Sequence, residues 1–248
     1  MIYVTSDLHG CSLARFQDML ESVGFQKEDE LIVLGDVIDR NGDGGIGLLL
    51  WITEQPNVRM ILGNHEAMML SCEFLFGEVT EEDLAFLNTE QMMLYVNWLR
   101  NGAKFTIESL KKLLTEDHER FEALWEYLME TPLFEILKVN GQVYLLTHSG
   151  LENFDPDKEP DEYGDDELLW NRPKITDRYY DNVTVIMGHT PTKYLDPESN
   201  GRMIRTPTWL DIDVGAADGR PPMILRLDDM KEFYFREEDG RTVPVKEE

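Results

Sequence analysis

The sequence predicts a mixed α/β protein in which a parallel β-sheet carries helices and a second sheet packs on the first. Three observations support this class. Short apolar, β-rich runs alternate with helical patterns over the first 76 residues, as in a β-α-β-α-β-α succession. After Pro132 the pattern turns to β. Five of the apolar runs end in Gly together with Asp, Asn or His, which places polar side chains at the carboxyl ends of strands.

The first 76 residues predict three strands and three helices in alternation. Ile2–Thr5 is a β-rich run, and Ser12 is suited to cap a helix from Leu13 to about Val23. Gly24 follows as the expected C-cap of that helix. The other predicted elements are strands over 31–34 and 58–62 and helices over 44–54 and 65–76.

Residues 78–130 interrupt this alternation and predict a helical insert. Thr80 precedes three acidic residues, which is typical of a helix start. Further helices are predicted over 92–101, 105–114 and 121–129, and we interpret their Met and aromatic residues as packing. The polar side chains at the strand ends are expected to form one site. The insert is expected to lie on top of that site or beside it.

Beyond the insert, the chain predicts mainly strands. Residues 133–139 and 142–147 flank Asn140-Gly141, the strongest short-range hairpin signal. Asp239-Gly240 predicts another hairpin turn. We expect the later strands to form a second sheet on the first. They are predicted over 183–187, 203–206, 209–214, 223–227 and 232–236.

The acidic segment, residues 152–167, contains nine acids and one base, Lys158. A segment with a charge of minus eight is expected to be a solvated, mobile rim rather than a packed element. It starts near the site, because it follows His148 in the chain.

Composition limits the functional class. A chain of 248 residues can fill a single domain, 1–248, and no apolar run is long enough for a bilayer span. The N-terminus lacks signal-peptide features, and Cys11 and Cys72 do not form a disulfide framework, so a cytoplasmic location is expected. A net charge of −26 argues against a nucleic-acid partner, and any phosphate site must be locally positive. The oligomeric state is not predicted.

The polar strand ends form a metal-ligand pattern. Four of the five histidines occur there. Asp7 and His9 share a face of an extended chain and can hold one ion, and Asp36 can bridge to a second. Imidazole, carboxylate and amide ligands without thiolate suit two divalent transition-metal ions, with manganese favoured and iron or zinc as alternatives. The ligands expected to complete the second site are Asn64, His148 and His189.

Neighbouring residues supply what phosphoryl transfer needs besides metals. Arg40 and Arg172 can bind non-bridging phosphate oxygens in bidentate geometry. His65 can donate a proton to the leaving group, with Asp39 as its orienting partner. Glu66 is expected to cap its helix or brace a neighbour.

Five motifs carry a family resemblance: Asp7-Leu8-His9-Gly10, Gly35-Asp36-Val37-Ile38-Asp39-Arg40, Gly63-Asn64-His65-Glu66, His148-Ser149-Gly150 and Gly188-His189-Thr190. Together they resemble the PPP-type serine/threonine protein phosphatases and the symmetrical diadenosine tetraphosphatases of the calcineurin-like metallophosphoesterase superfamily. Trp170-Asn171-Arg172 is most similar to the compact phage and bacterial protein phosphatases. The resemblance extends from Ile2 to about Gly215, apart from much of the insert and the acidic segment. It implies a two-sheet β-sandwich flanked by helices, the residue roles given above, and in-line attack by metal-bound hydroxide.

The motifs leave the substrate class open. Leu62 stands where protein phosphatases commonly have Arg. The tetraphosphatases also lack that Arg. The tetraphosphatases, however, typically replace the residues that match Asp39 and Glu66. The sequence therefore favours a phosphoserine or phosphothreonine phosphatase acting on proteins or peptides. A symmetrical diadenosine tetraphosphatase or another nucleotide phosphohydrolase is the alternative, and a non-catalytic phosphate-binding scaffold is a further one.

Three other polar positions are interpreted without a catalytic role. Asp211 and Asp213 are expected to brace the sheet or the edge of the site. His118 is expected to be a solvated helix residue. The alternative to a phosphate-binding role for Arg172 is that of a surface residue after a buried Trp170.

Overall fold

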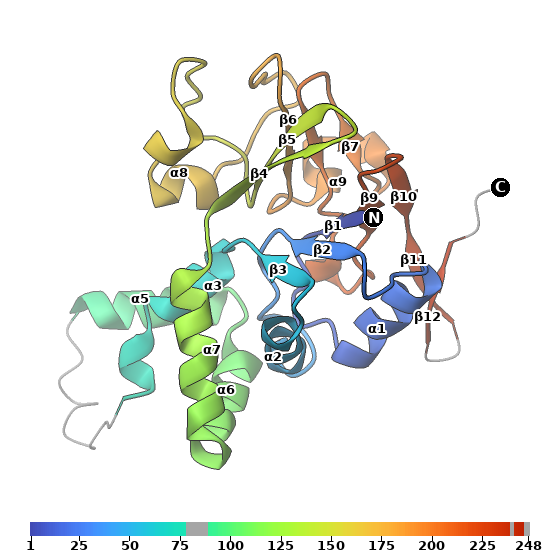
Figure 1. Ribbon diagram of the computed structural model, residues 1–248. Helices are drawn as coiled ribbons and strands as arrows, with labels where there is room; N and C mark the ends of the chain where they lie inside the picture. Colours follow the sequence, from blue (N-terminus) through green and yellow to red (C-terminus); the bar gives the residue numbers. More distant parts are fainter. Residues whose placement is uncertain (78–88, 239–240, 246–248) are drawn as a thin grey trace.

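The computed structural model describes residues 1–77, 89–238 and 241–245. Two five-stranded sheets pack against each other, and helices lie outside them (Figure 1). This architecture confirms the predicted α/β fold with two sheets flanked by helices. None of the helices in the described ranges combines the length and apolar character needed to cross a membrane.

The first sheet has the strand order β10-β9-β1-β2-β3. β1 pairs in parallel with β2, and β2 pairs in parallel with β3, as predicted. β9 is antiparallel to β1, and β10 is antiparallel to β9. The expectation that all later strands form the second sheet is therefore wrong for these two. The strands are β1 (Ile2–Thr5), β2 (Glu30–Val33), β3 (Val58–Met60), β9 (Ile224–Arg226) and β10 (Lys231–Phe233).

The second sheet has the order β4-β5-β6-β8-β7. The predicted hairpin is present as the antiparallel pair β4 and β5, and Asn140 has the positive φ of 50° that such a turn requires. β5, β6 and β8 run parallel, so their carboxyl ends lie at one edge of the sheet. The strands are β4 (Phe134–Val139), β5 (Gln142–Thr147), β6 (Thr184–Met187), β7 (Ile204–Arg205) and β8 (Trp209–Asp211).

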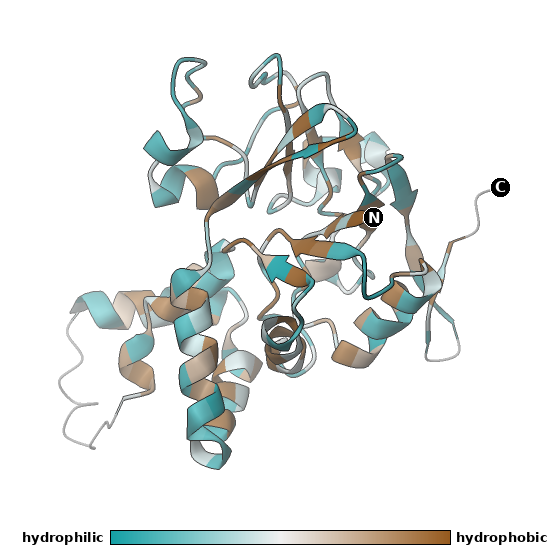
Figure 2. Cartoon of the chain, viewed as in Figure 1, coloured by the Kyte–Doolittle hydropathy of each residue, from teal (hydrophilic) through white to brown (hydrophobic). Residues whose placement is uncertain are grey.

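Side-chain alternation explains why the strand sequences are apolar throughout. Tyr3 and Leu31 face one way, into a core shared with the helices, whereas Val4 and Ile32 face the second sheet. In β5, Leu146 likewise belongs to the core between the sheets, whereas its neighbour Leu145 packs in a separate core on the other face of the second sheet. Both faces of each central strand are buried, so apolar and polar residues do not alternate along these strands. Figure 2 shows the central strands and α2 as largely hydrophobic.

Three helices accompany the first sheet. α1 (Leu13–Ser22) and α2 (Ile46–Glu54) lie on the face turned away from the second sheet (Figure 1). The Ser12 hydroxyl accepts the backbone N–H of Arg15, which confirms the predicted N-cap. α3 (Asn64–Leu70) is shorter than the predicted helix, and a 3₁₀ turn over Glu73–Leu75 follows it.

The insert contributes α5 (Thr89–Arg100), α6 (Lys104–Glu116) and α7 (His118–Glu130). They gather beyond the β3 edge of the first sheet (Figure 1). The proposed helix start at Thr80 lies outside the described residues. His118 is exposed at the start of α7, as predicted.

The end of the described chain forms a separate two-stranded ribbon. β11 (Phe235–Glu238) pairs in antiparallel register with β12 (Arg241–Pro244). The single strand predicted over 232–236 is thus divided between β10 and β11. The predicted turn at Asp239-Gly240 lies outside the described residues.

The acidic segment is more ordered than expected. Tyr163 and Pro160 are buried, and Lys158 Nζ lies 2.9 Å from Glu167 Oε2. The Glu167 carboxylate also accepts the backbone N–H of Gly164, which caps α8 (Asp165–Leu169). Eight of the nine acids are exposed, so the segment is solvated as expected. The expectation that it is unpacked is wrong, because Glu159 and Glu167 cap short helices and Tyr163 packs into the core.

Candidate metal centre

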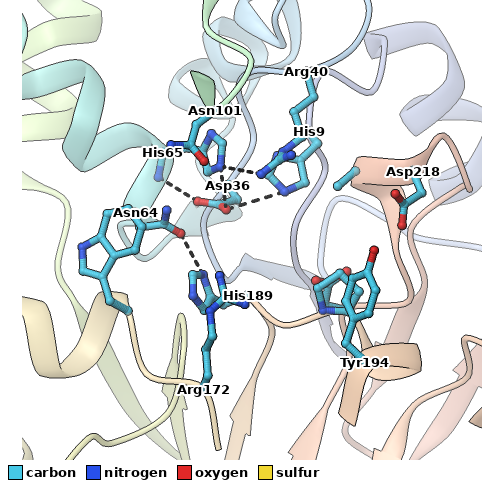
Figure 3. Close-up of a pocket in the computed structure, with 14 residues that line it drawn as sticks. His9, Asp36, Arg40, Asn64, His65, Asn101, Arg172, His189, Tyr194 and Asp218 are labelled. Carbon is cyan, nitrogen blue, oxygen red and sulfur yellow. Dashed lines mark hydrogen bonds and ion pairs between the residues drawn. The ribbon is translucent and has the colours of Figure 1, made fainter. Parts of the chain in front are cut away.

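Turns after strands of both sheets bring the predicted polar residues together. Asp7 and His9 follow β1, Asp36 follows β2, and Asn64 begins α3 just after β3. His148 and His189 follow the parallel strands β5 and β6 of the second sheet. Figure 3 shows His9, Asp36, Asn64, His65 and His189 around one pocket. The convergence predicted from the strand ends is therefore present.

The turns hold several of these residues in unusual backbone conformations. φ is 52° at Asp7, 40° at His9, 54° at Asp36 and 71° at His189. The left-handed region costs a non-glycine residue roughly 1–2 kcal/mol. Hydrogen bonds between the turns offset part of this cost. For example, the His9 amide donates to the Asp36 carbonyl at 2.9 Å. Backbone strain concentrated in this way is typical of functional sites.

A first group of ligand atoms surrounds one carboxylate oxygen of Asp36. Asp36 Oδ2 lies 3.6 Å from His9 Nε2 and 3.8 Å from His65 Nε2. Asp7 Oδ1 lies 3.8 Å from His9 Nε2. These distances leave room for an ion between the side chains, and His9, Asp36 and His65 form a group that could hold one.

A second group surrounds the other oxygen of the same carboxylate. Asp36 Oδ1 lies 3.5 Å from His148 Nε2. Asn64 Oδ1 lies 2.9 Å from both His148 Nε2 and His189 Nδ1. Asp36, His148 and His189 again form a group that could hold an ion. Asp36 is thus the one carboxylate shared by both groups.

Hydrogen bonds outside the groups orient the imidazoles toward the gaps. His148 Nδ1 donates to the Leu34 carbonyl at 2.7 Å, and His9 Nδ1 faces the Ile38 carbonyl at 3.3 Å. In the neutral imidazole this leaves Nε2 with a lone pair directed at the carboxylates. Asp7 Oδ1 and His189 Nε2 are moreover buried without a hydrogen-bond partner among the described residues. Converging lone pairs and orphaned atoms of this kind fit bound cations.

The electrostatics of the site favour the binding of cations. Burial, reinforced by neighbouring carboxylates, raises the pKa of Asp7 and Asp36 well above the usual value. Burial lowers the pKa of His148 to about 3 and that of His189 to about 2. The structure therefore disfavours charge on these groups, and divalent cations would restore favourable interactions for ionised carboxylates.

The predicted His65–Asp39 pair is formed. His65 Nδ1 donates to Asp39 Oδ2 at 2.6 Å, and both residues are buried. Burial raises the pKa of Asp39 to about 7, although hydrogen bonds to Thr106 and Trp98 oppose the rise. Burial and the Arg40 guanidinium lower the pKa of His65 to about 3. The unprotonated nitrogen of His65, Nε2, lies 3.3 Å from Arg40 Nη2.

The pocket also contains Arg40 and Arg172. Within the described ranges, neither guanidinium lies within 4.0 Å of a carboxylate oxygen, although the whole chain carries a net charge of −26. Arg172 Nη1 donates to the Thr190 hydroxyl at 3.4 Å. Two arginines that form no close ion pair with a described residue provide the locally positive site that an anionic ligand requires.

Glu66 has the bracing role predicted for it. Its Oε2 accepts the backbone N–H groups of Asp36 and Gly63, and its Oε1 accepts those of Val37 and Ile38. One buried carboxylate therefore ties the turn after β2 to the start of α3.

Sequence reasoning missed several residues of the pocket. Trp98 and Thr106 of the insert, interpreted as packing or left without comment, donate hydrogen bonds to Asp39. Asn101 and Tyr194 line the pocket, and no local motif marks them. Asp213 lines the edge of the pocket, in agreement with its predicted place, and Asp211 is buried beneath it. Trp170 is 37% exposed rather than buried, because it stands at the rim.

The two-sheet fold and the shared carboxylate between two imidazole groups define a metallophosphatase-type protein. The chain belongs to the calcineurin-like phosphoesterase family, whose model matches residues 1–214.

Curated relatives are matched over part of their length. The chain is 30% identical over 115 residues to the symmetrical bis(5'-nucleosyl)-tetraphosphatase of Wigglesworthia glossinidia brevipalpis. This match covers 45% of this chain and 42% of the relative. It is 32% identical over 103 residues to the enzyme of the same name from Chromobacterium violaceum, covering 40% and 36% of the two chains. The matches thus span about two fifths of these relatives.

Solved structures confirm the fold over nearly the whole chain. A crystal structure of a candidate diadenosine tetraphosphatase is similar with a TM-score of 0.60 and 17% identity, covering 98% of this chain and 92% of that one. A mutant cold-active protein tyrosine phosphatase is similar with a TM-score of 0.51 and 16% identity, covering 99% and 80%. At these identities the likeness concerns the fold alone.

Proposed function

We propose that this chain is a metal-dependent phosphohydrolase whose substrates are nucleotides, and dinucleoside polyphosphates in particular. The observation that carries the hydrolase proposal is the shared Asp36 carboxylate, each oxygen of which faces a different imidazole group. Arg40 and Arg172, which form no close ion pair with a described residue, line the same pocket. The names of the curated relatives, symmetrical bis(5'-nucleosyl)-tetraphosphatases, support the nucleotide class. The protein-phosphatase preference drawn from the motifs accordingly becomes the second candidate.

The metal ligands proposed are those predicted from the strand ends. Asp7, His9 and Asp36 would hold one cation, and Asp36 with Asn64, His148 and His189 would hold the other. When bound, the two cations would neutralise phosphate charge and make hydroxide available near neutral pH. Their identity is proposed as manganese first, because the mixed imidazole, carboxylate and amide ligands suit it, with iron or zinc as alternatives.

The chain's own residues would complete the reaction. Arg40 and Arg172 bind the non-bridging oxygens of the phosphate and hold it in line for attack. His65 Nε2 first takes up a proton from solvent, and the resulting imidazolium passes that proton to the leaving-group oxygen as the P–O bond breaks. Asp39 accepts the hydrogen bond from Nδ1–H and stabilises the protonated imidazole before that transfer.

Two aromatic residues at the rim support a substrate with nucleobases. Tyr194 is 66% exposed and lines the pocket together with Trp170 and Pro191. In Figure 3, Tyr194 lies across the pocket from Asn64 and His65. Exposed aromatic faces beside a phosphate site can stack on a base, which contributes about 1–3 kcal/mol per base.

One observation favours the second candidate, hydrolysis of phosphoserine or phosphothreonine in proteins or peptides. Asp39 is retained and paired with His65 at 2.6 Å. A strong proton-donating pair matters most for a poor leaving group, such as a serine alkoxide, and less for a nucleoside phosphate.

A substrate comparison on the metal-loaded full chain tests both candidates. We expect kcat/KM for diadenosine tetraphosphate to exceed that for phosphoserine and phosphothreonine peptides at least about tenfold, which is about 1.4 kcal/mol in transition-state binding. Chromatography should show two ADP molecules if cleavage is symmetrical. The reverse preference would support the second candidate. Absence of any phosphate hydrolysis by protein with two bound metals, verified by elemental analysis, would overturn the hydrolase proposal.

A further inference from the structure

The insert reaches into the site through the partner of His65. Trp98, on α5, donates its Nε1–H to Asp39 Oδ2 at 2.8 Å. Thr106, on α6, donates its hydroxyl to Asp39 Oδ1 at 2.5 Å. Trp98, Thr106 and Asp39 have no exposed surface. Both oxygens of the carboxylate are therefore fixed by insert residues, and Oδ2 also receives the Nδ1–H of His65.

The insert also secures the backbone on which Asp39 sits. Asp39 and Arg40 both have left-handed φ values, 73° and 70°. The Arg40 amide donates to the carbonyl of Gly102 at 3.1 Å. A Cβ atom on Gly44 would lie 2.3 Å from the Thr106 amide nitrogen, so the turn and α6 can approach only because glycine stands there. Strained residues persist only where surrounding contacts determine their conformation.

We propose that the helical insert is a positioning element for the His65–Asp39 pair, with Trp98 and Thr106 as positioning residues. Two fixed donors prevent rotation of the Asp39 carboxylate about its Cβ–Cγ bond. The oxygen that meets His65 Nδ1 then stays in place, which keeps the proton on Nδ1 and directs Nε2 to the pocket. The inference rests on the proposed proton-donor role of His65, but it holds for either substrate class.

A purely structural role would depend on different atoms. Trp98 also packs in the core shared by α2 and the insert, and removal of its ring would disturb that packing. The positioning role depends on the Nε1–H alone, and that of Thr106 on the hydroxyl alone. Substitutions that retain shape and remove one donor therefore separate the two roles.

The test compares donor-deleting variants with matched controls. Trp98→Phe and Thr106→Val each remove one donor, whereas Thr106→Ser retains it. Trp125→Phe removes an indole N–H elsewhere in the insert, and Thr115→Val removes a hydroxyl that donates to the Lys111 carbonyl within α6 at 2.8 Å.

Each donor-deleting variant should lower kcat about tenfold or more, because the Asp39 carboxylate then loses one of the two donors that hold it against His65. KM and metal content should change little, and the loss should be larger for aryl phosphates with poor leaving groups. Thr106→Ser and both controls should stay within about twofold of the parent chain. Equal kcat losses in Trp98→Phe and Trp125→Phe would overturn the proposal. Losses of the same size for aryl phosphates with good and with poor leaving groups would also overturn it.

A second readout needs no turnover. In zinc-loaded protein labelled with nitrogen-15 in its histidines, NMR identifies the protonated nitrogen of His65, with His65→Gln providing the assignment. We expect Nδ1–H in the parent chain and loss of that single state in Trp98→Phe combined with Thr106→Val. An unchanged signal in the double variant would overturn the positioning role. A parent chain without phosphatase activity would instead count against the proposed function, while the NMR comparison would still decide this inference.

Discussion

Replacement of Glu66 by Gln should strongly destabilise the metal-free protein. The two carboxylate oxygens of Glu66 accept four backbone N–H groups, from Asp36 and Gly63 at 2.8 and 3.1 Å and from Val37 and Ile38 at 2.9 and 3.2 Å. Gln has the same size, but its amide nitrogen, which replaces one carboxylate oxygen, cannot accept hydrogen bonds. Two of the four donors would lose their acceptor. A buried unsatisfied group costs about 1–3 kcal/mol, so the free energy of unfolding should fall by about 2–6 kcal/mol.

The assay is equilibrium unfolding in urea after complete removal of metal, so that a change in metal affinity does not enter. Glu73→Gln is the matched control, since Glu73 is exposed seven residues further along the chain. Comparable m-values would show that the two variants unfold from equally compact states. A difference below about 0.5 kcal/mol between Glu66→Gln and the control would refute the reasoning, because surface substitutions have effects of that size. Such a result would mean that Glu66 is protonated in the folded protein, because Gln resembles the neutral form of Glu.

Four further predictions concern the site. His65→Asn should retain metal but lower kcat by about 10²–10⁴, with a smaller loss for aryl phosphates with good leaving groups; an equal loss on all leaving groups would argue against the proton-donor role. Asp36→Asn should bind fewer than two metal ions per chain by elemental analysis, because each oxygen of Asp36 faces a different ligand group. Tyr194→Ala should lower kcat/KM for diadenosine tetraphosphate about fivefold or more and leave tripolyphosphate hydrolysis unchanged, since only the former has bases to stack. The Tm of metal-free protein should fall as pH rises from about 7 to 8.5, because burial raises the pKa of Asp7, Asp36 and Asp211 well above the usual value and that of Asp39 and Asp213 to about 7, so the folded state retains protons that the unfolded state has lost. Above about pH 7 the site histidines are mostly neutral in both states, so they no longer oppose this trend. Added Mn²⁺ should reverse that trend by replacing the protons, and a flat metal-free profile would contradict it.

The strand-end part of the site could be predicted because the signal is local. An apolar run followed at once by Gly and a polar residue indicates both the strand and the edge where its side chain emerges. The parallel order of β1, β2 and β3 then places Asp7, Asp36 and Asn64 together. The same local signal identified His148 and His189 in the second sheet.

Long-range contacts could not be predicted in this way. Trp98 and Thr106 lie 59 and 67 residues from Asp39, and an aromatic residue in a helix gives no sign of which buried carboxylate it meets. The apolar pattern of β9 indicates burial, but its place beside β1 depends on a pairing across the whole chain. The acidic segment was misjudged for another reason. Its overall charge suggested an unpacked loop, whereas the placement of Glu167 three residues after Gly164 is a helix-capping signal.

The left-handed backbone at Asp7, His9, Asp36 and His189 has a consequence for protein engineering. Glycine adopts that conformation without penalty, so glycine at any of these positions relieves strain in the metal-free chain. Each such gain also deletes a proposed ligand. A selection for heat resistance carried out without metal would therefore enrich glycine where the site needs a carboxylate or an imidazole, and it would lead away from activity. The same selection in the presence of Mn²⁺ would penalise those substitutions, because ligand loss then removes the stabilisation that bound metal provides.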